Sequence, residues 1–222
     1  MESETYYCGE MVAREGLEAV ARLLTSCSWP ISLRRSRRDD SLALYARTDE
    51  IDLEMPPGQS RSFLFSGSVS GSAAQALQRL EELSALLAGG KVTHRLEIYP
   101  SSSSSEKSGY LHYGWPEEKP ADPDLLESLS LALPWERTTE SLENQLYREL
   151  TPEHPLFGIA ARAIARRIDN DDVLFALSSP SSAILPLAVV HLGWTLEATP
   201  SALFPTTEFF ASLEEWVERG GR

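Results

Sequence analysis

A strand that leads directly into a capped helix is the strongest structural signal in this chain. Over residues 61–70, large apolar side chains alternate with serines, a period of two that is typical of a strand with one buried face. Ser72 is a favourable N-cap, and the helical pattern that follows continues to Ala88, after which Gly89 and Gly90 end the helix. The strand and the helix must bury their apolar sides in one core, so they predict a helix packed on a sheet.

The residues before this strand show a similar order. Strands are predicted at 5–12, 31–35 and 41–47, with a helix at 16–26; strands at 92–99 and 109–115 follow the second helix. This order is a β-α-β-β unit that occurs twice. Because each helix has one apolar stripe, both are expected on the same side of the sheet. The predicted fold class is therefore α+β, with an N-terminal two-layer domain over residues 1–116.

The last predicted hairpin carries the first group of candidate site residues. If its serine-rich loop is centred between positions 104 and 105, Glu97 faces His112 and Tyr99 faces Tyr110 across the two strands. These four side chains then form a polar and aromatic face of the sheet. A neighbouring carboxylate and imidazole can act as acid and base, but exposed Glu–His pairs also occur widely without a function. Both interpretations stay open.

The pattern changes after Trp115. Residues 117–123 are rich in proline and lack periodicity, so they are predicted to link the first domain to a small acidic α+β domain over residues 124–222. In that domain, helices are predicted at 123–133, 139–149 and 207–219, and strands at 173–177 and 185–196. The segment 159–168 is ambiguous. Its alanines and arginines favour a helix, whereas a turn and a clear strand follow it.

A series of short motifs runs through residues 150–218. It comprises a His-Pro-Leu start, an Ala-Arg-Arg element, an Asp-Asp-Val-Leu strand, a Val-Val-His-Leu strand that ends in tryptophan, and an acidic aromatic helix. In this order the chain resembles a small, uncharacterised family of bacterial proteins, with Arg166, Arg167, Asp171, Asp172, Val190, His191 and Trp194 at the matching places. The resemblance implies that Ile164–Arg167 is a strand of a three-stranded meander. It implies no activity.

The charge of the chain limits its partners. A formal charge of −13 arises from 33 acidic and 20 basic residues, and residues 120–222 contribute most of it, with 16 acidic and 7 basic side chains. Such a charge disfavours nucleic acid and anionic membrane surfaces and favours a basic protein partner. The alternative is a purely solubilising role. A cytoplasmic location is expected, because the sequence shows neither a signal peptide nor a long apolar segment.

Sequence motifs of known chemistry are missing. Gly67–Gly71 has Val69 where a nucleophile elbow needs serine, and it lacks the pattern of a phosphate-binding loop. The four histidines and two cysteines have the spacing of neither a metal site nor a disulfide framework. The acids at 169–172 fit a turn better than a calcium loop, and His191 is expected to bond a backbone carbonyl or a carboxylate. No cofactor or metal is predicted.

Three classes of function remain: a binding protein, an enzyme with an unfamiliar site, and a structural or adaptor module. The missing catalytic motifs favour the binding protein. In character, as a small, acidic α+β protein without catalytic signatures, the chain resembles the immunity proteins of bacterial toxin systems. That resemblance implies a non-catalytic protein that neutralises a basic partner.

The predicted partner surface combines the polar sheet face with the terminal acidic helix. Its residues are Glu97, Tyr99, Tyr110, His112, Glu214, Glu215, Trp216 and Glu218. For Trp216, a place in the core is the alternative. An enzyme would instead use the sheet face around Glu97 and His112, and an adaptor would form symmetric oligomers through Trp216 and its helix.

Overall fold

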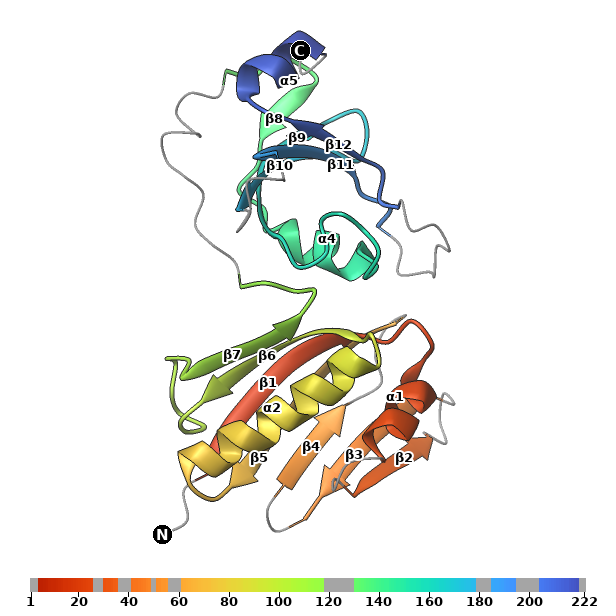
Figure 1. Ribbon diagram of the computed structural model, residues 1–222, viewed down its shortest axis with the longest axis vertical. Coiled ribbons are helices and arrows are strands. Elements are labelled where there is room, and N and C mark those ends of the chain that lie inside the picture. Colours follow the sequence, from red (N-terminus) through yellow and green to blue (C-terminus); the bar gives the residue numbers. More distant parts are fainter. Residues whose placement is uncertain are drawn as a thin grey trace. The chain divides into compact units, whose positions relative to one another are not determined.

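The computed structural model describes residues 4–25, 30–35, 41–48, 51–55, 61–117, 130–178, 185–194 and 204–219. The chain divides into two compact units, the first over Met1–Tyr113 and the second beginning at Gly114 (Figure 1). Each unit contains an antiparallel sheet with helices packed on it, so the fold is α+β, as predicted. The predicted linker, residues 117–123, lies outside the described residues except for Glu117.

The first unit contains a seven-stranded sheet with the strand order β2-β3-β4-β5-β1-β6-β7. Its elements are β1 (Glu4–Val12), α1 (Leu17–Leu24), β2 (Ile31–Arg35), β3 (Leu42–Arg47), β4 (Ile51–Met55), β5 (Ser62–Ser70), α2 (Ala73–Gly89), β6 (Thr93–Tyr99) and β7 (Gly109–Tyr113). The two nine-residue strands, β1 and β5, pair with each other near the middle of the sheet. All pairings are antiparallel, which permits one face to be buried and the other to face water.

Both helices of this unit lie on the same face of the sheet, as predicted (Figure 1). Their apolar stripes are buried against the inward-facing strand residues and comprise Leu17, Val20, Ala21 and Leu24 of α1, and Ala76, Leu80, Leu83 and Leu87 of α2. No described element of this unit covers the opposite face, where Leu64 is 64% exposed. We call this opposite face the open face.

The helix α2 begins where the sequence predicts. The Ser72 hydroxyl accepts a hydrogen bond from the Gln75 N–H at 3.3 Å, and the Gln75 side chain accepts one from the Ser72 N–H at 3.0 Å. This reciprocal capping box satisfies two backbone donors that the helix itself leaves without partners.

One strand of the first sheet was not predicted. In β4, the buried residues Ile51, Leu53 and Met55 alternate with Asp52 and Glu54. The strand has five residues between turn-like segments, too few for its alternation to stand out. It is defined by its pairing with β3 and β5. The element order is therefore β-α-β-β-β followed by β-α-β-β.

The second unit contains a five-stranded sheet with the order β12-β11-β10-β9-β8. Its elements are β8 (Trp135–Arg137), α4 (Glu143–Glu149), β9 (Ala160–Arg167), β10 (Asp172–Ser178), β11 (Leu187–His191), β12 (Thr207–Phe210) and α5 (Leu213–Arg219). The predicted meander forms its centre as β9, β10 and β11. The strand prediction for residues 164–167 is confirmed.

Two helix predictions in the second unit need correction. The terminal helix begins at Leu213 rather than at Thr207, because residues 207–210 pair with β11 as an edge strand. Residues 130–133, the end of the helix predicted at 123–133, are not helical, and the rest of that segment lies outside the described residues. In both cases pairing or turn geometry overrides the helical pattern, which is a weak predictor in short segments.

Candidate functional site

The open face of the first unit brings together four of the predicted site residues. Strand pairing arranges its side chains in rows that cross the sheet. One row contains Leu64, Glu10, Arg95 and His112, and the next contains Ser66, Cys8, Glu97 and Tyr110. Tyr99 lies in the row after that, opposite Tyr6. The polar and aromatic face therefore extends beyond the β6–β7 hairpin onto β1 and β5.

The predicted register of the β6–β7 hairpin is wrong by two residues. Glu97 pairs with Tyr110, and His112 pairs with Arg95. The long serine-rich loop does not fix its own centre, and the hairpin closes where the Ser108 N–H donates to the Ile98 carbonyl at 2.7 Å. A shift of two residues keeps every side chain on its predicted face but removes the direct Glu97–His112 pair.

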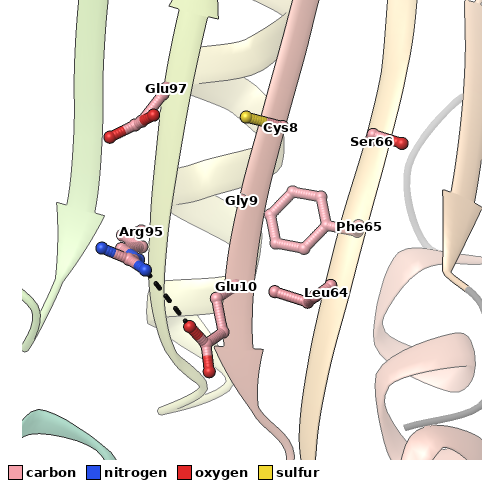
Figure 2. Close-up of a pocket in the computed structure, with 8 residues that line it drawn as sticks. All are labelled: Cys8, Gly9, Glu10, Leu64, Phe65, Ser66, Arg95 and Glu97. Atoms are coloured by element: carbon pink, nitrogen blue, oxygen red, sulfur yellow. Dashed lines mark hydrogen bonds and ion pairs between the residues drawn. The ribbon is translucent and has the colours of Figure 1, made fainter. Parts of the chain in front are cut away.

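Small side chains near the middle of the open face create a depression. Cys8 and Ser66 lie opposite each other, and the longer side chains of Glu10, Leu64 and Arg95 stand in the neighbouring row. The depression has a volume of about 410 Å³ and is lined by Cys8, Gly9, Glu10, Leu64, Phe65, Ser66, Arg95 and Glu97 (Figure 2). We call it the β1 depression. Its volume falls within the roughly 300–1,000 Å³ that is usual for binding pockets.

Glu10 is the most deeply buried charged side chain of the depression, with 3% of its side chain exposed. One carboxylate oxygen accepts a hydrogen bond from the Ser62 hydroxyl at 2.5 Å. The other pairs with the Arg95 guanidinium at 3.3 Å (Figure 2). These partners offset the desolvation of the carboxylate, which would otherwise strongly disfavour the charged form.

Glu97 lies at the β6 side of the depression and is less buried. Its side chain is 28% exposed. One carboxylate oxygen accepts a hydrogen bond from the Tyr99 hydroxyl at 2.6 Å, and the other pairs with the Lys107 ammonium at 3.5 Å. The bond to Glu97 raises the pKa of Tyr99 to about 12, because it stabilises the protonated phenol.

The thiol of Cys8 is poorly suited to nucleophilic chemistry. Burial and the nearby charge of Glu97 raise its pKa, so the thiolate is disfavoured. Activated cysteines show the opposite shift, which positive neighbours or helix N-termini cause. The Cys8 thiol therefore gives no support for a nucleophilic role of the β1 depression.

The terminal helix α5 contributes less surface than predicted. Trp216 is 1% exposed and packs edge-on against Trp135, with the ring centroids 5.1 Å apart. The prediction that Trp216 contacts a partner is therefore wrong, and its place in the core is the correct alternative. Glu215 accepts a hydrogen bond from the Ala211 N–H at 2.7 Å and pairs with Arg219. Of the three α5 acids in the predicted partner surface, Glu214 and Glu218 are exposed.

The acidic turn at residues 169–172 and His191 lie together in the second unit. His191 Nδ1 bonds Asp172 at 2.8 Å, so this histidine bonds a carboxylate, as predicted. The Trp194 indole donates to Asp171 at 2.7 Å, and the Arg167 guanidinium donates to Asp169. These acids thus serve a turn and its side-chain partners. The described ranges contain no group of three or more His, Cys, Asp or Glu side chains that could hold a metal ion.

Two buried glutamates of α4 gave no signal in the sequence. Glu149 accepts hydrogen bonds from the Gly193 and Trp194 N–H groups, both at 2.8 Å, and its burial raises its pKa. Glu143 accepts a bond from the Ala163 N–H at 2.7 Å. Each carboxylate satisfies backbone donors that come from distant parts of the chain. Their role is to hold α4 and the loop after β11 in place.

Comparison of the chain with protein-family models, curated proteins and solved structures gives no match. The resemblance of residues 150–218 to a bacterial family and the likeness in character to immunity proteins therefore stay predictions. None of the helices in the described part of the chain is long and apolar enough to cross a membrane.

Proposed function

We propose that this chain is a non-catalytic binding protein that neutralises a basic protein partner, as an immunity protein neutralises a bacterial toxin. The observation that supports this proposal is the open face of the first unit. There, carboxylates and aromatic side chains surround the β1 depression, and the thiol beside them is not activated. The partner docks on this face.

The composition of the open face suits a basic partner. Its strands carry the acids Glu4, Glu10, Asp52, Glu54 and Glu97, against the bases Arg34, Arg47 and Arg95. They also carry Tyr6, Tyr45, Tyr99 and Tyr110. Tyrosine is enriched at protein interfaces because its ring packs and its hydroxyl bonds. The overall charge of −13 would speed the approach of a cationic protein.

The alternative functions have lost their particular support. The enzyme interpretation relied on Glu97 facing His112, whereas Glu97 is bonded to Tyr99 and Lys107. The adaptor interpretation relied on an exposed Trp216, which lies in the core. A binding role needs neither feature.

The proposal is tested with the product of the neighbouring gene. Co-expression should rescue cells from its toxicity, and surface kinetics should show an association rate that falls steeply with salt, because the screening length shortens to about 10 Å at 0.1 M. Changing Glu54 and Glu97 together to glutamine should slow association severalfold. The matched control changes Glu81 and Glu82 of α2, which carry the same charge on the covered side of the sheet.

The outcomes separate the parts of this proposal. If the intact chain neither binds nor rescues, the immunity function is rejected. If both double variants slow association equally, the open face is not the docking surface.

A further inference from the structure

We infer that the β1 depression is a socket for one basic side chain, an arginine or a lysine, of a protein partner. This inference rests on the proposed function and adds to it a position and a recognition chemistry. It follows from the shape, the apolar rim and the charge of the depression.

The apolar rim consists of Leu64. On β5, the other residues that face outward are the serines Ser62, Ser66, Ser68 and Ser70. Leu64 is 64% exposed among them, directly opposite Glu10. An exposed leucine beside a carboxylate matches the two parts of a long basic side chain, whose aliphatic stem packs on apolar surface while its charged end stays polar.

The residues that line the depression carry two carboxylates, Glu10 and Glu97, and one guanidinium, that of Arg95. Arg95 pairs with Glu10 at 3.3 Å, and Lys107, which lies outside the lining, pairs with Glu97 at 3.5 Å. A cation gains charge-assisted hydrogen bonds, for which Glu97 retains acceptor capacity beyond its bonds to Tyr99 and Lys107.

Three weak acids on the open face have a carboxylate as a neighbour. The pKa of Cys8 is raised by burial and by Glu97, that of Tyr99 by its bond to Glu97, and that of Tyr6 by its bond to Glu4. In each case a carboxylate contributes to the shift.

Cys8 offers a direct measurement of the electrostatic potential in the depression, because its exposed thiol lines it. Its modification rate is compared for a cationic and an anionic methanethiosulfonate reagent, with peptide mass mapping to separate Cys8 from Cys27. The cationic reagent should react faster, and Glu97→Gln should lower the rate ratio severalfold. Glu81→Gln on α2 is the matched control and should leave the ratio unchanged. Equal rates for both reagents, or a faster anionic reagent, would overturn the inference.

Binding is tested with two short neutral peptides that differ only in a central arginine or its uncharged isostere citrulline. In amide NMR spectra, the arginine peptide should shift the signals of Cys8, Gly9 and Leu64. The citrulline peptide should bind roughly tenfold more weakly, a difference of about 1.4 kcal/mol, because its uncharged side chain loses the charge-assisted bond to Glu97. Leu64→Ser should abolish the shifts. Equal binding of both peptides, or shifts confined to other surfaces, would refute the socket.

The two proposals can fail separately. If the arginine peptide binds in the depression but the neighbouring gene product does not bind the protein, the proposed function fails and the socket stands. If the gene product binds the Leu64→Ser and Glu97→Gln proteins with unchanged affinity, the socket is overturned and the proposed function stands.

Discussion

His94 should make the first unit sensitive to mild acid. It lies on β6 with 0% exposure, and its Nδ1 bonds the Val92 carbonyl at 2.8 Å. A carbonyl only accepts, so Nδ1 carries the proton. In the neutral imidazole Nε2, 2.8 Å from the Ser84 hydroxyl, accepts a bond from that hydroxyl. Burial lowers the pKa of the imidazole from 6.5 to about 4.

The sign and size of the effect follow from this lowered pKa. The unfolded chain binds a proton at His94 near pH 6.5, whereas the folded protein binds it only near pH 4. Stability from the neutral imidazole is thus complete above pH 6.5 and is lost as the pH falls. Each pKa unit corresponds to about 1.4 kcal/mol, so the free energy of unfolding should fall by about 2 kcal/mol between pH 7 and pH 5.

A substitution isolates this effect from the titration of carboxylates. His94→Asn removes the titrating group and lowers stability at pH 7, but the difference between wild type and variant should shrink by about 2 kcal/mol at pH 5. Hydrogen exchange of α2 and β6 amides, corrected for intrinsic rates, measures the unfolding free energy of the first unit at both pH values. His112→Asn, which removes an exposed imidazole of β7, is the matched control. A constant difference for His94→Asn at both pH values would refute the reasoning.

Three further predictions concern packing, and urea unfolding measures each. Gly67→Ala should destabilise the first sheet by about 1–3 kcal/mol, because the new Cβ would lie 1.8 Å from the Asp52 carbonyl oxygen. The control is Gly89→Ala at the end of α2, where a new Cβ meets nothing within 4 Å, so this variant should be neutral or stabilising. Tyr147→Phe should cost about 1–3 kcal/mol, since it leaves the buried Ala161 N–H, now bonded to the phenol oxygen at 2.9 Å, without a partner. Trp216→Ala should lower the free energy of unfolding by about 3–5 kcal/mol, because Trp216 is buried. Glu218→Ala, in the same helix but exposed, should lower it by less than about 0.5 kcal/mol. Similar losses of stability for the two variants would contradict the core position of Trp216.

Local patterns predicted the longer elements well. The strands β1 and β5 and the helix α2 begin within one residue of their predicted starts. Alternation, an N-cap serine and paired glycines are signals within a few neighbouring residues, so the sequence carries them directly. The short strands β4, β8 and β12 escaped prediction. With three to five residues each, they owe their conformation to the strands beside them.

The sequence by itself determined which residues of the β6–β7 hairpin share a face, because alternation in a strand does not depend on register. Only the tertiary structure decided which residues from different segments become neighbours. Cys8, Ser66 and Glu97 form one row since β1 lies between β5 and β6, and Trp216 is buried since α5 packs over Trp135. No local pattern encodes such neighbours. They come from segments far apart in the chain, and the packing of the whole unit selects them.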